Sequence, residues 1–210
     1  MLCPRRLTFA LAALWPWVAL EITAARAAQD PAASFVDNVA KELAAVIDSN
    51  DPPEVKHKRF LEIIENSVDV DGIARFCLGR FWHQASPQQQ REYLALFHQL
   101  LLNAIIGRLQ EYKGVKHTIG RTIHQTDNTL VQTVIVRPGS EPAHVDWVVA
   151  NVDGKPKIED LLVEGTSLRI TQRSDYSSFL LHNNSNVQAL IDKLRQMLAN
   201  QQQQQAQKSG

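Results

Sequence analysis

Two sets of side chains have types that could support catalysis or metal binding. Asp160 and Glu164 could form a carboxylate pair, but four residues apart on a predicted strand they would lie about 13 Å apart, too far to share a proton. The chain has seven histidines, yet no pair has tight metal-ligand spacing, and His117 and His124 are seven residues apart on a predicted strand. Neither set predicts a carboxylate-pair enzyme or a metal site.

Ser167 and the arginines that follow it were considered next. Ser167 would act as a nucleophile only beside a histidine on a strained turn, and the chain contains no G-x-S-x-G motif, so a helix N-cap is the simpler interpretation. Arg169 and Arg173 are one helical turn apart. They could meet an acidic partner or a phosphate, with a solvated helix face as the alternative.

The first residues are typical of an export signal. Arg5 and Arg6 precede an apolar stretch over residues 7–20, which is short for a membrane span, and residues 25–27 read Ala-Arg-Ala. We therefore predict a cleaved signal peptide over residues 1–27, a single domain over residues 28–200 and a disordered Gln-rich tail over residues 201–210. Arg5 and Arg6 also suggest the twin-arginine route, but the surrounding residues fit Sec export better. An uncleaved anchor helix is the alternative.

Charge and cysteine content exclude several classes. The chain has 22 Lys and Arg against 22 Asp and Glu, and loss of the leader leaves a net charge of about −2. This argues against a nucleic-acid binder and a polybasic membrane-surface protein, and no second run is long enough for a stable membrane span. Cys77 would be the single cysteine of the mature protein, which leaves no internal disulfide and favours a small core residue.

Apolar spacing near 3.6 residues predicts helices before the middle of the chain. The longest should begin at Ser86, because Ser86, Pro87 and Gln89 form a capping box with proline at the first helical position. Its apolar residues leave only a narrow polar strip, so it should be covered on more than one side. The expected helices span residues 31–49, 54–67, 69–78 and 86–113.

The apolar period then changes to two. Four strands over residues 115–124, 129–137, 144–152 and 157–163 are joined by short turns, which predicts an antiparallel meander. Helices over residues 167–181 and 186–199 follow. The fold class is therefore α+β, a four-stranded antiparallel sheet covered by helices, with the long helix as the expected cover.

Two blocks together resemble one family. Residues 73–90 read IARFCLGRFWHQASPQQQ and residues 160–176 read DLLVEGTSLRITQRSDY. Their order and spacing are similar to those of the MlaC family of periplasmic phospholipid-binding proteins, also called toluene-tolerance auxiliary proteins, including the hopanoid-associated branch. The resemblance extends over residues 33–198. It implies a strongly curved sheet under a helical cover, with a deep apolar cavity between them for acyl chains and the headgroup near solvent.

The resemblance also implies a function without catalysis. It implies lipid shuttling between an outer-membrane lipoprotein–porin complex and an inner-membrane lipid ABC transporter with an MCE-domain component, which maintains outer-membrane asymmetry. Phospholipid is the implied cargo, a hopanoid is the variant, and no cofactor is expected beyond the bound lipid. Thr166 and residues 148–150 depart from the family pattern.

Burial of acyl chains suffices energetically for such a carrier. Each buried CH₂ contributes about 0.8 kcal/mol, so two chains total about 25 kcal/mol before ordering costs, beyond the limit of about 20 kcal/mol seen for non-covalent affinity. The sequence offers many apolar side chains and no convergent charged cluster. The predicted lining is Leu94, Phe97, Leu101, Ile105, Leu109, Val134, Val136, Val145, Trp147, Val149, Leu161 and Val163.

Two other readings remain open. The predicted lining could pack against itself, which would make the protein a structural adaptor with a filled core. A cavity enzyme acting on a small polycyclic substrate would instead need an ionisable group inside, and His98 and Tyr112 are the candidates on or beside the apolar stripe.

Overall fold

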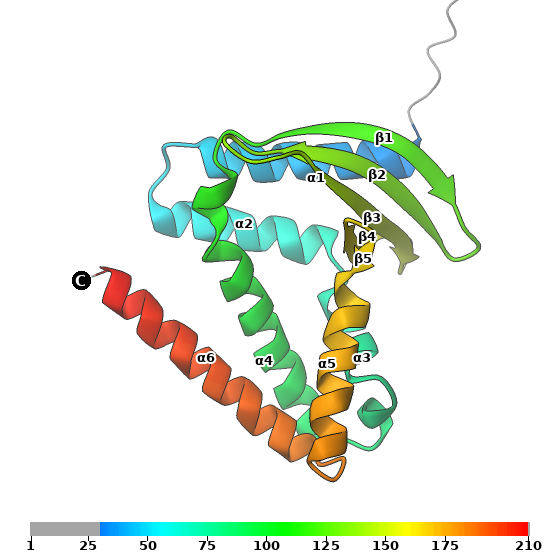
Figure 1. Ribbon diagram of the computed structural model, residues 1–210, viewed down its shortest axis with the longest axis vertical. Helices are drawn as coiled ribbons and strands as arrows, with labels where there is room; N and C mark the ends of the chain where they lie inside the picture. Colours follow the sequence, from blue (N-terminus) through cyan, green and yellow to red (C-terminus); the bar gives the residue numbers. More distant parts are fainter. Residues whose placement is uncertain (1–29, 210) are drawn as a thin grey trace, which may run out of the picture.

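The computed structural model describes residues 30–209, and the predicted signal peptide lies outside the described residues. Figure 1 shows a curved sheet lying over α1, with the other helices extending away from it. No helix in this part of the chain is long and apolar enough to cross a membrane. The helical elements are α1 (Pro31–Asp48), α2 (Pro53–Ser67), α3 (Val70–Leu78), η1 (Gly79–His83), α4 (Pro87–Ile106), η2 (Leu109–Tyr112), α5 (Leu168–His182) and α6 (Val187–Ser209).

The sheet confirms the predicted meander and adds a short fifth strand. The strands are β1 (Lys116–His124), β2 (Asn128–Val136), β3 (Ala143–Val152), β4 (Lys155–Val163) and β5 (Thr166–Ser167), in that spatial order. Every pairing within the sheet is antiparallel. The sequence did not predict β5, because two residues are too few to show an alternating pattern.

The N-terminal helix α1, and not the long helix α4, covers the sheet. Ala33, Val36 and Val39 of α1 pack against one face of the strands, where they form the cluster called here the sheet cluster. Figure 1 shows α1 running beneath β1 and β2. The expectation that α4 covers the sheet is wrong. An apolar stripe shows that a helix face is buried but not which surface buries it.

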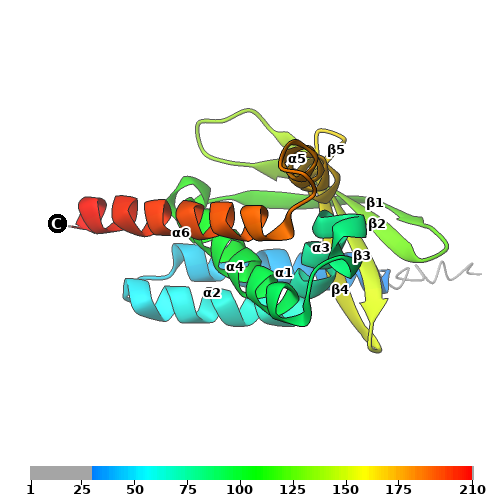
Figure 2. The same ribbon diagram turned by 90° about the horizontal axis from the view of Figure 1, so that it is seen from below.

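A second core, called here the helical cluster, joins the remaining helices. Tyr93 and Phe97 of α4 lie in it with Leu190 and Ile191 of α6. The Tyr93 hydroxyl donates a hydrogen bond to the Ala74 carbonyl of α3 at 2.8 Å, so this buried polar group is satisfied. Figure 2 shows α6 running alongside α4. These contacts on several sides explain why α4 is apolar around most of its circumference.

The start of α4 is as predicted, and its end is not. The Ser86 hydroxyl accepts from the Gln89 amide, and the Gln89 side chain accepts from the Ser86 amide, which completes the capping box. The helix ends at Ile106 instead of near residue 113, and η2 follows. Gly107 occupies the C-cap, where the low helix propensity of glycine favours an end.

The glutamine-rich tail is helical in the structure. Helix α6 continues through Ser209, so the prediction of a disordered tail from residue 201 is wrong. Glutamine and alanine are good helix formers, and no proline or glycine interrupts residues 187–209. Composition suggested disorder because the tail has few apolar residues, but a preceding helix that is already folded removes the cost of starting a new one.

Candidate functional site

The C-terminal half of α4 carries apolar side chains that the core does not fully cover. Tyr93, Leu96, Phe97 and Leu100 are buried in the helical cluster. One turn later the chain presents a half-buried group, called here the apolar band, which packs on the edge of that cluster. The apolar band consists of Leu101, Leu102, Ile105, Ile106 and Leu109.

Three residues connect the apolar edge of the helices to the sheet. Leu43 of α1, Ile63 of α2 and Val68 pack against both the helical cluster and the sheet cluster. The two cores therefore meet along a seam, and the apolar band lies on the helical side of the same packing region. Acyl chains could be held between two apolar surfaces here if the seam opens.

The helical half of the predicted lining lies on the helical side of this seam. Leu101, Ile105 and Leu109 belong to the apolar band, and Leu94 is also half-buried against the helical cluster. Phe97 is buried within that cluster. Leu102 and Ile106 were not in the predicted lining, although the all-round apolar character of α4 was a signal for them.

The strand half of the predicted lining is divided between the two faces of the sheet. Val145, Trp147 and Val149 lie in the sheet cluster facing α1, and Leu161 packs against it. Val163 pairs with Val145 on that face but is exposed at the end of β4.

The inclusion of Val134 and Val136 in the same wall is wrong. Val134 pairs with His144, and Val136 pairs with Lys116. Cross-strand partners share a face, so these valines lie on the side opposite Val145. Alternation within each strand was read correctly, but a shift of one residue in register exchanges the faces, and local sequence does not fix the register.

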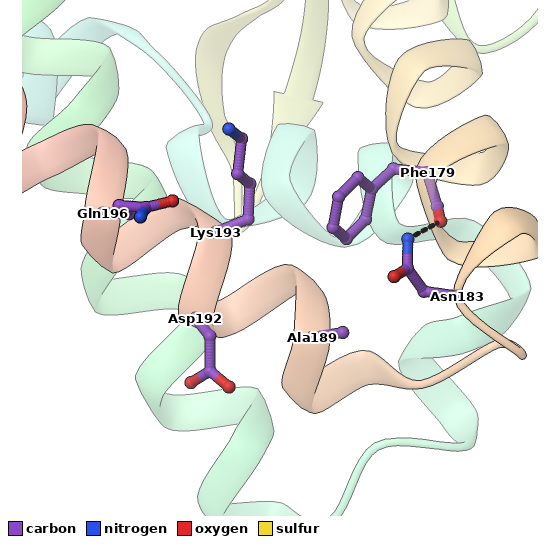
Figure 3. Close-up of a pocket in the computed structure, with 6 residues that line it drawn as sticks. All are labelled: Phe179, Asn183, Ala189, Asp192, Lys193 and Gln196. Carbon is purple, nitrogen blue, oxygen red and sulfur yellow. Dashed lines mark hydrogen bonds between the residues drawn. The ribbon is translucent and has the colours of Figure 1, made fainter.

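Two surface pockets were found in the described residues, and neither contains a predicted lining residue. The larger, of about 460 Å³, lies between Phe179 and Asn183 of α5 and four residues of α6, including Asp192 and Lys193 (Figure 3). The second, of about 340 Å³, lies between α1 and α2 and includes Ile63. The charged groups of the first pocket make it a poor site for acyl chains.

A polar pair is buried within the apolar wall of the sheet. The Trp147 indole N–H donates to the Thr133 hydroxyl at 3.0 Å, and that hydroxyl donates to the Val145 carbonyl at 2.7 Å. Thr133 and Trp147 are both buried. The pair fixes the orientation of the largest side chain on this face without leaving an unsatisfied polar group.

We expect Thr133→Val to destabilise the protein by about 2 kcal/mol, because the indole N–H loses its buried acceptor. Urea unfolding followed by circular dichroism measures the change. Thr118→Val is the matched control on an exposed strand position and should stay within about 0.5 kcal/mol. An equal loss in both variants would contradict the proposed role of the pair.

The candidates for catalysis lie outside the seam. The His98 Nε2 atom lies 2.7 Å from an Asp71 oxygen, with both side chains partly exposed. Tyr112 is exposed beneath the Arg137 guanidinium. Burial, with a smaller contribution from Asp160, raises the pKa of the Cys77 thiol to about 12, so it stays neutral. No cluster of three metal-ligating side chains occurs among the residues described.

The segment after β4 is a turn stabilised by polar contacts. Glu164 and Gly165 both have positive φ, at 48° and 77°, and Gly165 adopts this conformation without strain. The Ser167 hydroxyl accepts from the Ile170 amide, which confirms Ser167 as the N-cap of α5. The same hydroxyl donates to Asp160 at 2.5 Å. Asp160 and Glu164 do not act as a pair, because the Glu164 carboxylate accepts from the His144 amide.

Asp160 is the main polar residue of this segment. Its carboxylate also accepts from the backbone amides of Leu161 and Arg169, at 2.8 and 3.1 Å. The Arg169 guanidinium lies 3.6 Å away. The prediction of capping for Asp160 is thus confirmed in kind, but its central place was missed. A single acidic residue at the start of an apolar run was the available signal.

Two comparisons relate this chain to known proteins. A sequence model of the MlaC protein family matches residues 34–196. The fold is similar to that of a phospholipid-binding protein from Ralstonia solanacearum, solved in complex with a phospholipid. The TM-score is 0.70 at 20% sequence identity, and the match covers 81% of this chain and 98% of the other. At this identity the structural likeness shows a shared fold.

Proposed function

Because the chain belongs to the MlaC family, we propose that it is a carrier that binds phospholipid through the acyl chains. The observation that carries this proposal is the half-buried apolar band beside the seam between the two cores. The phospholipid in the structurally similar protein from Ralstonia solanacearum supports the same cargo class. The lipid would separate the helical side of the seam from the sheet side and fill the space between them.

The energetic requirement favours an apolar site without a charged cluster. Each CH₂ removed from water contributes about 0.8 kcal/mol, so burial of a few carbons of each chain offsets the loss of packing at the seam. Leu43, Ile63 and Val68, which contact both cores, would exchange some protein contacts for lipid contacts. A carrier needs such a balance, because it must also release its cargo.

We further propose that the mature protein works in the periplasm after Sec export. It would exchange lipid with an inner-membrane ABC transporter that has an MCE-domain component and with an outer-membrane lipoprotein–porin complex. The family match and the export signal in residues 1–27 support this role. The proposal requires no cofactor and no catalytic step.

Native mass spectrometry with lipid extraction tests the cargo. The protein should be made with its signal peptide in a bacterial host and purified from the periplasm without detergent. We expect a complex whose added mass equals that of a phospholipid, and phosphorus in the extract. A hopanoid in the extract would instead support the polycyclic variant of the carrier. A mass equal to that of the protein alone, from a host rich in both lipids, would contradict both.

A further inference from the structure

Arginine–aromatic contacts are concentrated on one surface formed by α3, η1 and α5. Helices α3 and α5 pack side by side, as Figure 1 shows. Three rings within residues 76–82 each lie under at least one guanidinium group, at distances of 4.5 to 5.4 Å between the guanidinium carbon and the ring centre. The four arginines, called here the arginine surface, are Arg75 over Trp82, Arg80 over Phe81, and Arg169 and Arg173 over Phe76.

Stacking of this kind orients a guanidinium group while its N–H donors remain available at the edge. Arg173 shows how closely the backbone is fitted to this purpose. Its Nε atom lies 3.1 Å from the position that a side-chain carbon would take at Gly79, which has φ of 57°. The glycine therefore leaves the space in which Arg173 lies over Phe76.

Two of the four guanidinium groups have no polar partner. Among the residues that the structure describes, Arg80 and Arg173 make ring contacts but no hydrogen bond or ion pair. Arg75 lies 3.6 Å from Asp71, and Arg169 lies 3.2 Å from Glu159. Wherever an arginine of this surface has an anionic partner, that partner is a carboxylate.

The arginine surface lies at the opposite end of α4 from the apolar band. The Gln90 side chain, near the start of α4, donates to the Trp82 carbonyl of η1 at 2.8 Å. Ile105 of the apolar band follows about 15 residues later, or about 22 Å along the helix axis. The two surfaces can therefore be altered independently.

We propose that the arginine surface is the docking site for an acidic segment of a partner protein. Asp and Glu carboxylates of that segment accept paired hydrogen bonds from Arg80 and Arg173, a geometry that the planar guanidinium fits. The four groups are spread along two helices, and a phosphate ligand would need them to converge. The inference rests on the proposed function only in that a carrier must meet other proteins.

Binding of a fluorescent peptide rich in Asp and Glu, followed by anisotropy on the mature protein, tests this surface. We expect the double variant Arg80→Glu with Arg173→Glu to bind at least about tenfold more weakly, and wild-type binding to weaken as salt rises. The double lysine variant should lose several-fold, because lysine cannot form the paired hydrogen bonds.

The matched control is Arg121→Glu with Lys155→Glu, an equal charge change at exposed positions on the sheet. It should bind within about twofold of wild type, as expected for exposed charges away from the site. An equal loss in the control would overturn the proposal, as would binding of inorganic phosphate or phosphatidylglycerol vesicles at this surface without peptide binding. Lipid co-purification with the Arg80 and Arg173 variants should be unchanged, so failure of the carrier function would be recognised separately.

Discussion

Replacement of Leu101 by arginine should remove most of the lipid that co-purifies with the protein. Leu101 lies half-buried in the apolar band, at the edge of the helical cluster. An arginine there either places a charge against the acyl chains or holds the seam open to water, and an unpaired charge in an apolar site costs several kcal/mol. Since about 1.4 kcal/mol corresponds to a factor of ten, we expect at least about a tenfold loss of bound lipid.

The measurement is quantitative lipid extraction from equal amounts of purified protein, with circular dichroism to verify folding. Leu181→Arg provides the matched control, because Leu181 is 56% exposed on α5 and lies outside the apolar band. That control should retain wild-type lipid. A folded Leu101→Arg protein with wild-type lipid content would show that Leu101 does not contact the cargo.

Asp160→Ala should be the most destabilising single change considered in this protein, at about 3 kcal/mol. Asp160 is 6% exposed and accepts hydrogen bonds from two backbone amides and the Ser167 hydroxyl. Its removal leaves these donors without an acceptor and the Arg169 guanidinium without its buried neighbour. Arg169 is partly exposed and still pairs with Glu159, so the loss should fall at the lower end of values for broken buried ion pairs.

Urea unfolding of the wild type and two variants separates this network from a general effect of charge. Asp175→Ala removes an exposed carboxylate from the same helix and should change the free energy of unfolding by less than about 0.5 kcal/mol. Asp160→Asn keeps one acceptor oxygen and should lose about half as much as alanine. A loss below 1 kcal/mol for Asp160→Ala would show that the surrounding donors find water instead.

The boundaries of most elements were predictable, because the signals that set them are local. Ser86, Pro87 and Gln89 marked the start of α4, and Ser167 marked that of α5. Each signal depends on hydrogen bonds within one turn of helix. The end of α4 at Gly107 was missed, since the apolar pattern continues past the glycine into Leu109.

The wall of the candidate site was only partly predictable. Leu101 and Ile105 were identified because all-round apolar character is visible along the helix itself. Val134 was assigned to the wrong face, because its position depends on pairing with His144 in another strand. Nothing within either strand alone favours one register over a shift of one residue.

The sequence by itself determined the α+β class, the order of helices and strands, and the two blocks that resemble the MlaC family. These properties follow from periodicity and short-range hydrogen bonding, which act between residues close in the chain. Only the tertiary structure decided that α1 covers the sheet, that two apolar cores meet at Leu43, Ile63 and Val68, and that Asp160 anchors α5 to β4. These contacts join segments far apart in the chain, and apolar attraction has no direction that a local sequence pattern can encode.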